Sequence, residues 1–139
     1  QGLKKVRRTC DIVLIHDGVR PFISYNLINT CIENASIYKA CVPVIEVTDT
    51  IKEVSEEGWV VKTLDRKRIR AAQTPQAFDY SLIRECYERA VTEDEEFTDD
   101  ASIVEYYGHR VKTIEGLYKN IKITTPLDLR LAEIIASIY

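Results

Sequence analysis

A carboxylate and a guanidinium stand three residues apart, directly after a short apolar segment. Residues 11–15 (DIVLI) are typical of a buried strand, and Asp17 and Arg20 follow in the tract HDGVRP. Open α/β sheets bind ligands beyond the carboxyl ends of their strands, where a carboxylate can meet a magnesium-bound nucleotide. The alternative is turn chemistry with a surface ion pair, and the tract alone leaves both interpretations open.

A lysine of similar potential stands near the C-terminus. Lys122 lies between Asn120 and residues 124–126 (TTP), which predict a helix start. Its ammonium group could therefore reach an anion near a helix N-terminus. A lone lysine in a strand is more often a side chain that extends its amine to solvent. Residues 73–76 (QTPQ) are rich in hydrogen-bonding groups but by themselves predict only a turn.

Apolar strands alternate with amphipathic helices along the chain. This alternation predicts the α/β class, with one mostly parallel sheet and flanking helices. The last helix is expected to bury its apolar residues in the core. The expected elements are strands at 11–15, 42–47, 68–73, 111–115 and 121–124, helix N-caps at Ser24, Asp79, Thr98 and Thr125, and buried Leu131, Ile134, Ile135 and Ile138 in the last helix.

Residues 50–64 predict a β-hairpin that projects from the sheet. Two extended segments flank residues 55–58 (SEEG), whose length and closing glycine suit a four-residue hairpin loop. A two-stranded ribbon is only marginally stable in water by itself. We therefore expect Ile51, Trp59 and Val60 to rest on another surface.

Composition excludes several classes of function. Lys and Arg number 19 against 22 Asp and Glu, so the basic excess typical of nucleic-acid binding is absent. The apolar runs fall far short of the ~20 residues that span a bilayer. Four cysteines without a CxxC pair and two distant histidines favour reduced, cytoplasmic thiols over zinc or disulfides. The acidic residues 93–96 predict a solvated loop.

Five short tracts carry the most specific signal in the chain. They are HDGVRPF (16–22), TDTIK (48–52), AAQTPQAF (71–78), TDDAS (98–102) and NIKITTP (120–126). In this order they resemble the 2-C-methyl-D-erythritol 4-phosphate cytidylyltransferase family. The resemblance runs from about Gly2 to the C-terminus, and Gly18 stands where an alanine is more often found, a change that a loop tolerates.

The resemblance implies a Rossmann-like nucleotidyltransferase fold whose projecting β-arm clasps a second subunit in a homodimer. Members of the family begin with a glycine-rich loop that holds the CTP triphosphate, and no tract here matches it. The chain also lacks methionine. We therefore expect residues 1–139 to be the C-terminal portion of one nucleotidyltransferase domain, incomplete at the N-terminus. The missing N-terminal segment would be a partner, and the chain alone nearly inactive.

The activity implied by the resemblance is transfer of CMP from CTP to 2-C-methyl-D-erythritol 4-phosphate, with release of pyrophosphate, in the non-mevalonate route to isoprenoids. The expected location is the cytoplasm, or the plastid stroma in a plant. Asp17 resembles the acidic residue that orients both substrates near Mg²⁺ and would be the metal ligand. Arg20 resembles its cationic or structural partner. Lys122 resembles the lysine that stabilises charge at the α-phosphate, and Asn120 is a weaker candidate for the metal neighbourhood.

Four further residues resemble contacts to the sugar phosphate. Thr50 and Arg66, on or just after the arm, resemble the pair that is offered across the dimer to the methylerythritol phosphate group. Thr74 and Thr98 resemble hydroxyl contacts to the same substrate. Guanidinium groups can pair bidentately with phosphate, and hydroxyls add directional hydrogen bonds.

Two alternatives remain open on the sequence. A ribitol 5-phosphate cytidylyltransferase shares the fold, the CTP chemistry and several tracts, although AAQ at 71–73 and TDDAS at 98–102 favour the methylerythritol branch. A non-catalytic dimerisation or binding module, made of the arm and half a sheet, belongs to a different class. Parallel assays with both sugar phosphates distinguish the first alternative, and the natural absence of a phosphate loop would favour the second.

Overall fold

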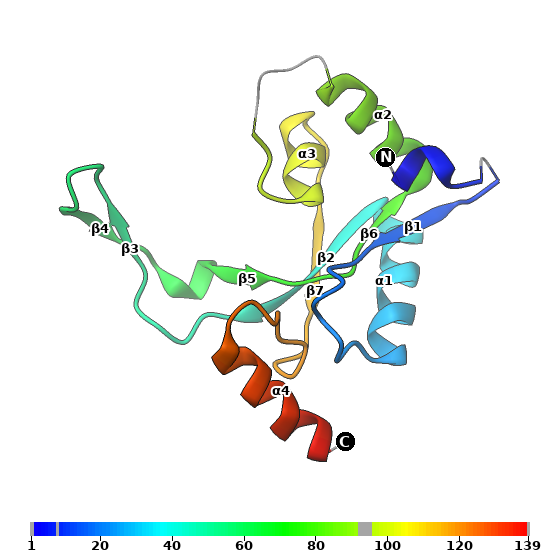
Figure 1. Ribbon diagram of the computed structural model, residues 1–139. Helices are drawn as coiled ribbons and strands as arrows, with labels where there is room; N and C mark the ends of the chain where they lie inside the picture. Colours follow the sequence, from blue (N-terminus) through cyan, green and yellow to red (C-terminus); the bar gives the residue numbers. More distant parts are fainter. Residues whose placement is uncertain (1, 8, 92–95, 139) are drawn as a thin grey trace.

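The computed structural model describes residues 2–7, 9–91 and 96–138, and it forms a mixed sheet with helices on both faces (Figure 1). Of the acidic stretch expected to be a solvated loop, residues 93–95 lie outside the described part. The elements are a 3₁₀ turn at Gly2–Lys5, β1 (Ile12–Ile15), α1 (Tyr25–Tyr38), β2 (Ala40–Glu46), β3 (Lys52–Val54), β4 (Val60–Thr63), a 3₁₀ turn at Arg66–Arg68, β5 (Arg70–Ala72), β6 (Gln76–Asp79), α2 (Tyr80–Ala90), α3 (Asp100–Tyr106), β7 (Lys112–Glu115) and α4 (Pro126–Ile138).

The main sheet has the order β1-β6-β2-β5, and β7 pairs with β2 along its other edge. The predicted α/β class with flanking helices is confirmed, but the sheet is mixed rather than mostly parallel. Among the described strands, β2 and β7 are the one pair that runs parallel, whereas β5 and β6 run antiparallel to their neighbours. The reason is the connection. The chain returns from β2 to β5 through the arm without the crossover helix that a parallel pair requires, so β5 and β6 run back along β2.

Alternating side chains of β2 and β6 divide the core between the two faces of the sheet. Ala40 and Phe78 pair across the strands and face α2 and α3, while the next pair, Cys41 and Ala77, faces α1. Successive residues of a strand point to opposite faces, so one pair of strands serves both core clusters. Residues 76–79, for which the sequence predicts no strand, form β6, which lies between β1 and β2.

Polar caps define where the helices begin. Ser24 and Asp79 cap α1 and α2 as predicted. The predicted cap Thr98 is wrong by one residue. Asp99 caps α3 and forms a reciprocal capping box with Ser102, since a carboxylate can accept from the amide of N3. At α4 the predicted start is confirmed.

The predicted strand at 121–124 does not form. Residues 121–124 are irregular, and the Ile123 amide donates to the Val19 carbonyl at 2.9 Å instead of joining a sheet ladder. This bond holds the segment against the loop that follows β1. The backbone before α4 therefore forms a hydrogen bond with the loop after β1 instead of joining the sheet.

The predicted burial of α4 is also wrong. Only Ala132 of this helix is buried, while Leu131, Ile134 and Ile138 are 44%, 57% and 68% exposed and Ile135 is half-buried. The reason is position, because α4 extends away from the sheet and both core clusters (Figure 1). Among the described helices, none has the length and apolar character needed to cross a membrane.

The predicted arm is present. Strands β3 and β4 form a separate two-stranded sheet that projects from the body of the molecule (Figure 1). Its loop is closed by a hydrogen bond from the Ser55 amide to the Trp59 carbonyl, and Gly58 adopts a φ of 86° that favours glycine. Trp59 is 76% exposed, so little of its side chain is buried within this chain.

Gly116 provides a test of the packing between β2 and the segment after β7. A Cβ atom at this position would lie 2.6 Å from the Gln73 Oε1 atom and 3.1 Å from the Val44 carbonyl oxygen. We expect Gly116→Ala to lower the free energy of unfolding by about 1–3 kcal/mol, the cost of overpacking a tight site. Urea denaturation measures the difference.

The matched control is Gly18→Ala, because a Cβ atom at Gly18 would meet nothing within 4 Å. This variant should unfold at the same urea concentration as the unaltered chain. Equal midpoints for both alanine variants would show that the Gly116 contact does not constrain the fold.

Candidate active site

Two cations converge on one carboxylate at the end of β1. Asp17 Oδ2 lies 3.1 Å from Arg20 Nε and 3.2 Å from Lys122 Nζ. A turn closed by the Arg20 amide on the Asp17 carbonyl, at 3.0 Å, brings the first pair together. The Lys122 side chain is about half exposed, so its ammonium group remains accessible to a ligand. The structure therefore brings together the three residues predicted to be catalytic.

The electrostatics of Asp17 favour its ionised form. Partial burial raises its pKa, but hydrogen bonds and charges from Lys122 and Arg20 outweigh that effect, so the pKa lies below its ordinary value. One carboxylate between two cations leaves a net positive charge, which suits the negative oxygens of phosphate groups.

A buried amide network that the sequence did not reveal fixes the segment carrying Lys122. Gln73 Nε2 donates to the Leu117 carbonyl at 2.9 Å, and Gln73 Oε1 accepts from the Leu117 amide at 3.0 Å. Asn120 Nδ2 donates to the Thr74 carbonyl at 2.8 Å, while the Asn120 carbonyl accepts from Arg20 Nη1 at 2.8 Å. Both amide side chains are buried, so these bonds replace water for the loop backbone.

Thr74 lies directly beside Asp17. Its Oγ1 atom accepts from the Asp17 amide at 3.0 Å and lies 2.9 Å from His16 Nδ1. The break between β5 and β6, which includes a cis Thr74-Pro75 peptide, gives Thr74 this position. Thr74, whose hydroxyl is predicted to contact the substrate, is therefore adjacent to the Asp17 cluster. The tract around Thr74, which by itself predicted only a turn, was the available signal for it.

Thr98 precedes the first turn of α3, and the side chain of Gln76 anchors that turn. Gln76 Nε2 donates to Asp99 Oδ2 at 2.7 Å, and Gln76 Oε1 accepts from the Ala101 amide at 2.8 Å. Thr98 itself is exposed. Asp100, in the first turn of α3, is close enough to Asp17 for that charge to act on it. Burial raises the pKa of Asp100, the negative charges of Asp99 and Asp17 add to this, and together they outweigh a hydrogen bond from Tyr87.

Thr50 and Arg66 lie at the base of the arm and are not part of the Asp17 cluster. Both are exposed, and Arg66 Nη1 donates to the Thr48 carbonyl. Arg66 also lines a cavity of about 240 Å³. Its other lining residues are Glu46, Val47, Thr48, Lys67 and Arg70. This basic cavity can receive an anion, but within this chain it is separate from the first cluster.

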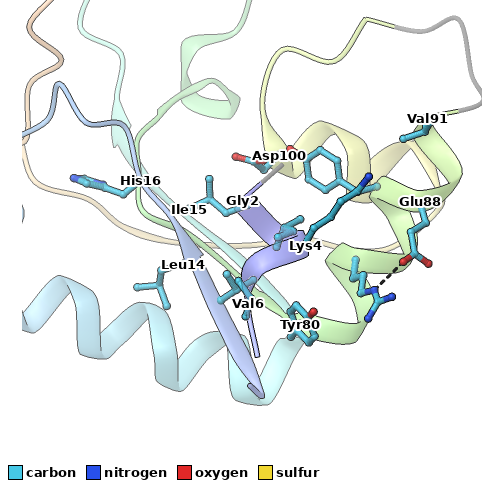
Figure 2. Close-up of a pocket in the computed structure, with 14 residues that line it drawn as sticks. Gly2, Lys4, Val6, Leu14, Ile15, His16, Tyr80, Glu88, Val91 and Asp100 are labelled. Atoms are coloured by element: carbon cyan, nitrogen blue, oxygen red, sulfur yellow. Dashed lines mark hydrogen bonds and ion pairs between the residues drawn. The ribbon is translucent and has the colours of Figure 1, made fainter. Parts of the chain in front are cut away.

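A cavity of about 1020 Å³ lies between the 3₁₀ turn at Gly2–Lys5, β1, α2 and α3 (Figure 2). Val13, Ile15 and Tyr80 give it an apolar lining, and His16 and Asp100 connect it with the Asp17 region. The edge of β1 beside this cavity has no partner among the described strands. The cavity is therefore continuous with an unpaired sheet edge.

The acidic groups of the site are too few to hold Mg²⁺ alone, but they fit a Mg²⁺ ion that substrate phosphates also bind. The described residues contain no group of three or more His, Cys, Asp or Glu side chains that could hold a metal ion. Mg²⁺ in nucleotide sites is usually held by one or two carboxylates together with substrate phosphates. The single carboxylate of Asp17 meets that requirement. The amide of Asn120 is directed to the Thr74 carbonyl, and its buried Oδ1 has no hydrogen-bond partner among the described residues.

Replacing Lys122 by methionine should raise the pKa of Asp17 toward its ordinary value of about 3.9, because a hydrogen bond and a positive charge are lost. In the unaltered chain the folded pKa lies below the unfolded one. The ion pairs therefore stabilise the fold above about pH 4, and this contribution is lost as the pH falls through the lowered pKa. Carboxyl-carbon NMR titration measures the pKa of Asp17 in the unaltered chain and in the Lys122→Met variant.

Asp128 serves as the internal control. The amide and hydroxyl groups of Thr124 and Thr125 hold the pKa of Asp128 at about 2, independently of Lys122. A shift at Asp128 equal to that at Asp17, or no shift at Asp17, would contradict the ion pair.

Comparison with known proteins identifies the family. A family model described as "IspD: 2-C-methyl-D-erythritol 4-phosphate cytidylyltransferase" matches residues 1–137. The protein of that name from Clostridium beijerinckii is 51% identical over 132 residues, which are 95% of this chain and 58% of the relative. The one from Clostridium novyi is 48% identical over 132 residues, covering 95% of this chain and 57% of the relative. The chain thus spans somewhat more than half the length of these curated relatives.

Solved structures agree with the sequence relatives. The 4-diphosphocytidyl-2C-methyl-D-erythritol synthase of Anaerococcus prevotii superposes with a TM-score of 0.92 at 36% identity, over 98% of this chain and 61% of that one. The 2-C-methyl-D-erythritol 4-phosphate cytidylyltransferase of Thermus thermophilus gives a TM-score of 0.87 at 37% identity, over 97% of this chain and 65% of that one. The chain belongs to the 2-C-methyl-D-erythritol 4-phosphate cytidylyltransferase family.

Proposed function

We propose that this chain forms part of an enzyme that transfers CMP from CTP to 2-C-methyl-D-erythritol 4-phosphate, giving 4-diphosphocytidyl-2-C-methyl-D-erythritol and pyrophosphate. The observation that carries the proposal is the convergence of Arg20 and Lys122 on Asp17 at the end of β1, in a member of a family named for this reaction. A phosphate oxygen of the sugar alcohol attacks the α-phosphorus of CTP, and the bond to the departing pyrophosphate breaks.

The main obstacle to this reaction is repulsion between two anions, so charge neutralisation and positioning supply most of the catalysis. Lys122 is half exposed and can interact with an α-phosphate oxygen. Its ion pair with Asp17 and the amide network behind Asn120 hold the ammonium group in place before substrate arrives. Arg20 is fixed between Asp17 and the Asn120 carbonyl and therefore acts mainly as a structural cation.

We assign the Mg²⁺ ligand role to Asp17. Its lowered pKa keeps the carboxylate ionised, as metal binding requires. A bound Mg²⁺ would neutralise charge on the nucleotide phosphates. Further ligands would come from the nucleotide and water, consistent with the small number of carboxylates here.

The glycine-rich loop for the CTP triphosphate is absent from this sequence, whose five glycines are scattered. In a protein of the relatives' length, we propose that the additional portion supplies this loop and covers the unpaired edge of β1. The activity therefore belongs to a family-length protein, by which we mean this chain together with that portion.

We propose that the sugar phosphate is held by two subunits. Thr74 and Thr98 would contact it from the subunit that carries the Asp17 cluster. Thr50 and Arg66 would contact its phosphate from the arm of the second subunit, because within one chain both lie outside the cluster and Arg66 lines a basic cavity. The exposed apolar side chains of the arm support this homodimer, since they include Val54, Trp59, Val60 and Val61.

Lys122→Ala and Arg66→Ala should have different kinetic effects in a family-length protein. Loss of Lys122 removes one preorganised charge partner, so kcat should fall by about a hundredfold or more. Loss of Arg66 should mainly raise KM for the sugar phosphate. A coupled pyrophosphate assay with CTP and 2-C-methyl-D-erythritol 4-phosphate measures both.

Ribitol 5-phosphate serves as the comparison substrate in the same assay, because the sequence left it open. Faster turnover with ribitol 5-phosphate would replace the proposed acceptor. Equal, small effects of both substitutions on kcat and KM would show that the assigned roles are wrong.

Replacing Trp59 and Val61 by serine should convert dimers to monomers, because the change removes apolar area from the arm without altering Thr50 or Arg66. Light scattering measures the mass in solution. The matched control is Val91→Ser, which replaces an exposed apolar residue at the end of α2, away from the arm. An unchanged dimer mass in the arm variant would reject the arm as the dimer contact.

A further inference from the structure

Both ring nitrogens of His16 form hydrogen bonds within the candidate site. Nε2 lies 3.0 Å from the Arg20 carbonyl oxygen, and Nδ1 lies 2.9 Å from Thr74 Oγ1. The Thr74 oxygen also accepts from the Asp17 amide at 3.0 Å. His16 therefore connects both ends of the 17–20 loop with Thr74, although the proposed reaction assigns it no role.

For a neutral His16 ring, the carbonyl group at one end of this chain of bonds determines the position of every proton in it. A carbonyl oxygen can only accept, so His16 Nε2 carries the hydrogen and donates it to Arg20. A neutral imidazole has one N–H, so Nδ1 must accept. Thr74 then donates its hydroxyl proton to Nδ1, while the Asp17 amide donates to the Thr74 oxygen.

We propose that His16 is a positioning residue that commits the Thr74 hydroxyl proton to its own ring, so that Thr74 offers only an acceptor lone pair to the substrate. A hydroxyl oxygen has two lone pairs, and the Asp17 amide uses one of them. The other can accept from a hydroxyl of the sugar alcohol. It cannot bond to a phosphate oxygen, which at neutral pH is itself an acceptor.

This inference refines the proposed function by assigning Thr74 to the polyol part of the substrate rather than to its phosphate. The substrate assignment rests on the proposed function. The proton assignment does not, because it follows from the bonding partners of His16 and Thr74 alone. The two can therefore be tested separately.

Histidine NMR on the 139-residue chain tests the proton assignment. The chain has only two histidines, so His109, which is exposed, is the internal reference. At about pH 8, where an ordinary imidazole is neutral, nitrogen-15 spectra should show His16 with the hydrogen on Nε2. Thr74→Val should move the Nδ1 resonance of His16 toward that of an unbonded ring nitrogen, whereas Thr74→Ser should leave it in place. A hydrogen on Nδ1, or no response to Thr74→Val, overturns the inference.

Kinetics of a family-length protein test the consequence for the substrate. His16→Gln can still donate to the Arg20 carbonyl but lacks the acceptor at Nδ1, whereas His16→Asn places an amide oxygen near that position. We expect His16→Gln to raise KM for the sugar phosphate about fivefold, the scale of one lost hydrogen bond, with little change in kcat or in KM for CTP. His16→Asn should restore most of the loss, and His109→Gln should have no effect.

A double-substitution cycle distinguishes positioning from simple loop stability. If His16 acts through Thr74, His16→Gln should add little to the KM increase of Thr74→Val. Additive effects, or equal losses in the Gln and Asn variants, would overturn the positioning role. Absence of pyrophosphate release from the unaltered family-length protein would instead reject the proposed function, and the NMR result would stand.

Discussion

Burying the polar backbone of two loops is the constraint on which the candidate site depends. The loop after β1 and the segment before α4 meet at the Asn120 carbonyl, which accepts from Arg20 across a sequence separation of 100 residues. Carbonyl and amide groups removed from water need partners inside the protein, and Gln73, Asn120 and Arg20 supply them. The same bonds that satisfy the backbone thereby hold Lys122 next to Asp17.

The mixed sheet gives this contact a third contributor. β5 and β6 form one interrupted strand, in which β6 pairs with β1 and the first part of β2, and β5 pairs with the last part of β2. The break between them places Gln73 and Thr74 beside the end of β1. Gln76, the first residue of β6, forms hydrogen bonds with the first turn of α3. One interruption of a strand therefore positions side chains toward the Asp17 loop, the Lys122 segment and α3.

Two separate regions of the molecule carry an excess of positively charged side chains. The Asp17 cluster combines one carboxylate with two cations near the end of β1, whereas the Arg66 cavity lies at the base of the arm. In the proposed reaction the sugar phosphate approaches the α-phosphate of CTP, so the proposal uses the two regions, one from each subunit, to neutralise the two phosphates that are joined. The exposed apolar residues of the arm and the unpaired edge of β1 are two different surfaces, and the proposal gives them different partners.

Sequence alone determined the local features whose causes lie within a few residues. The caps of α1, α2 and α4, the arm with its glycine-closed loop, and the ion pair of Asp17 with Arg20 could all be predicted, because short-range hydrogen bonds and side-chain alternation produce them. The family resemblance singled out Lys122 and Thr74 without showing how they meet Asp17.

Tertiary structure decided the direction of β5 and β6, the irregular backbone at 121–124, the exposure of α4 and the buried amides of Gln73 and Asn120. An apolar strand has the same pattern whichever way it runs, and an apolar helix has the same pattern whether or not a neighbour covers it. The partner of a buried amide lies many residues away, so only the folded chain identifies it.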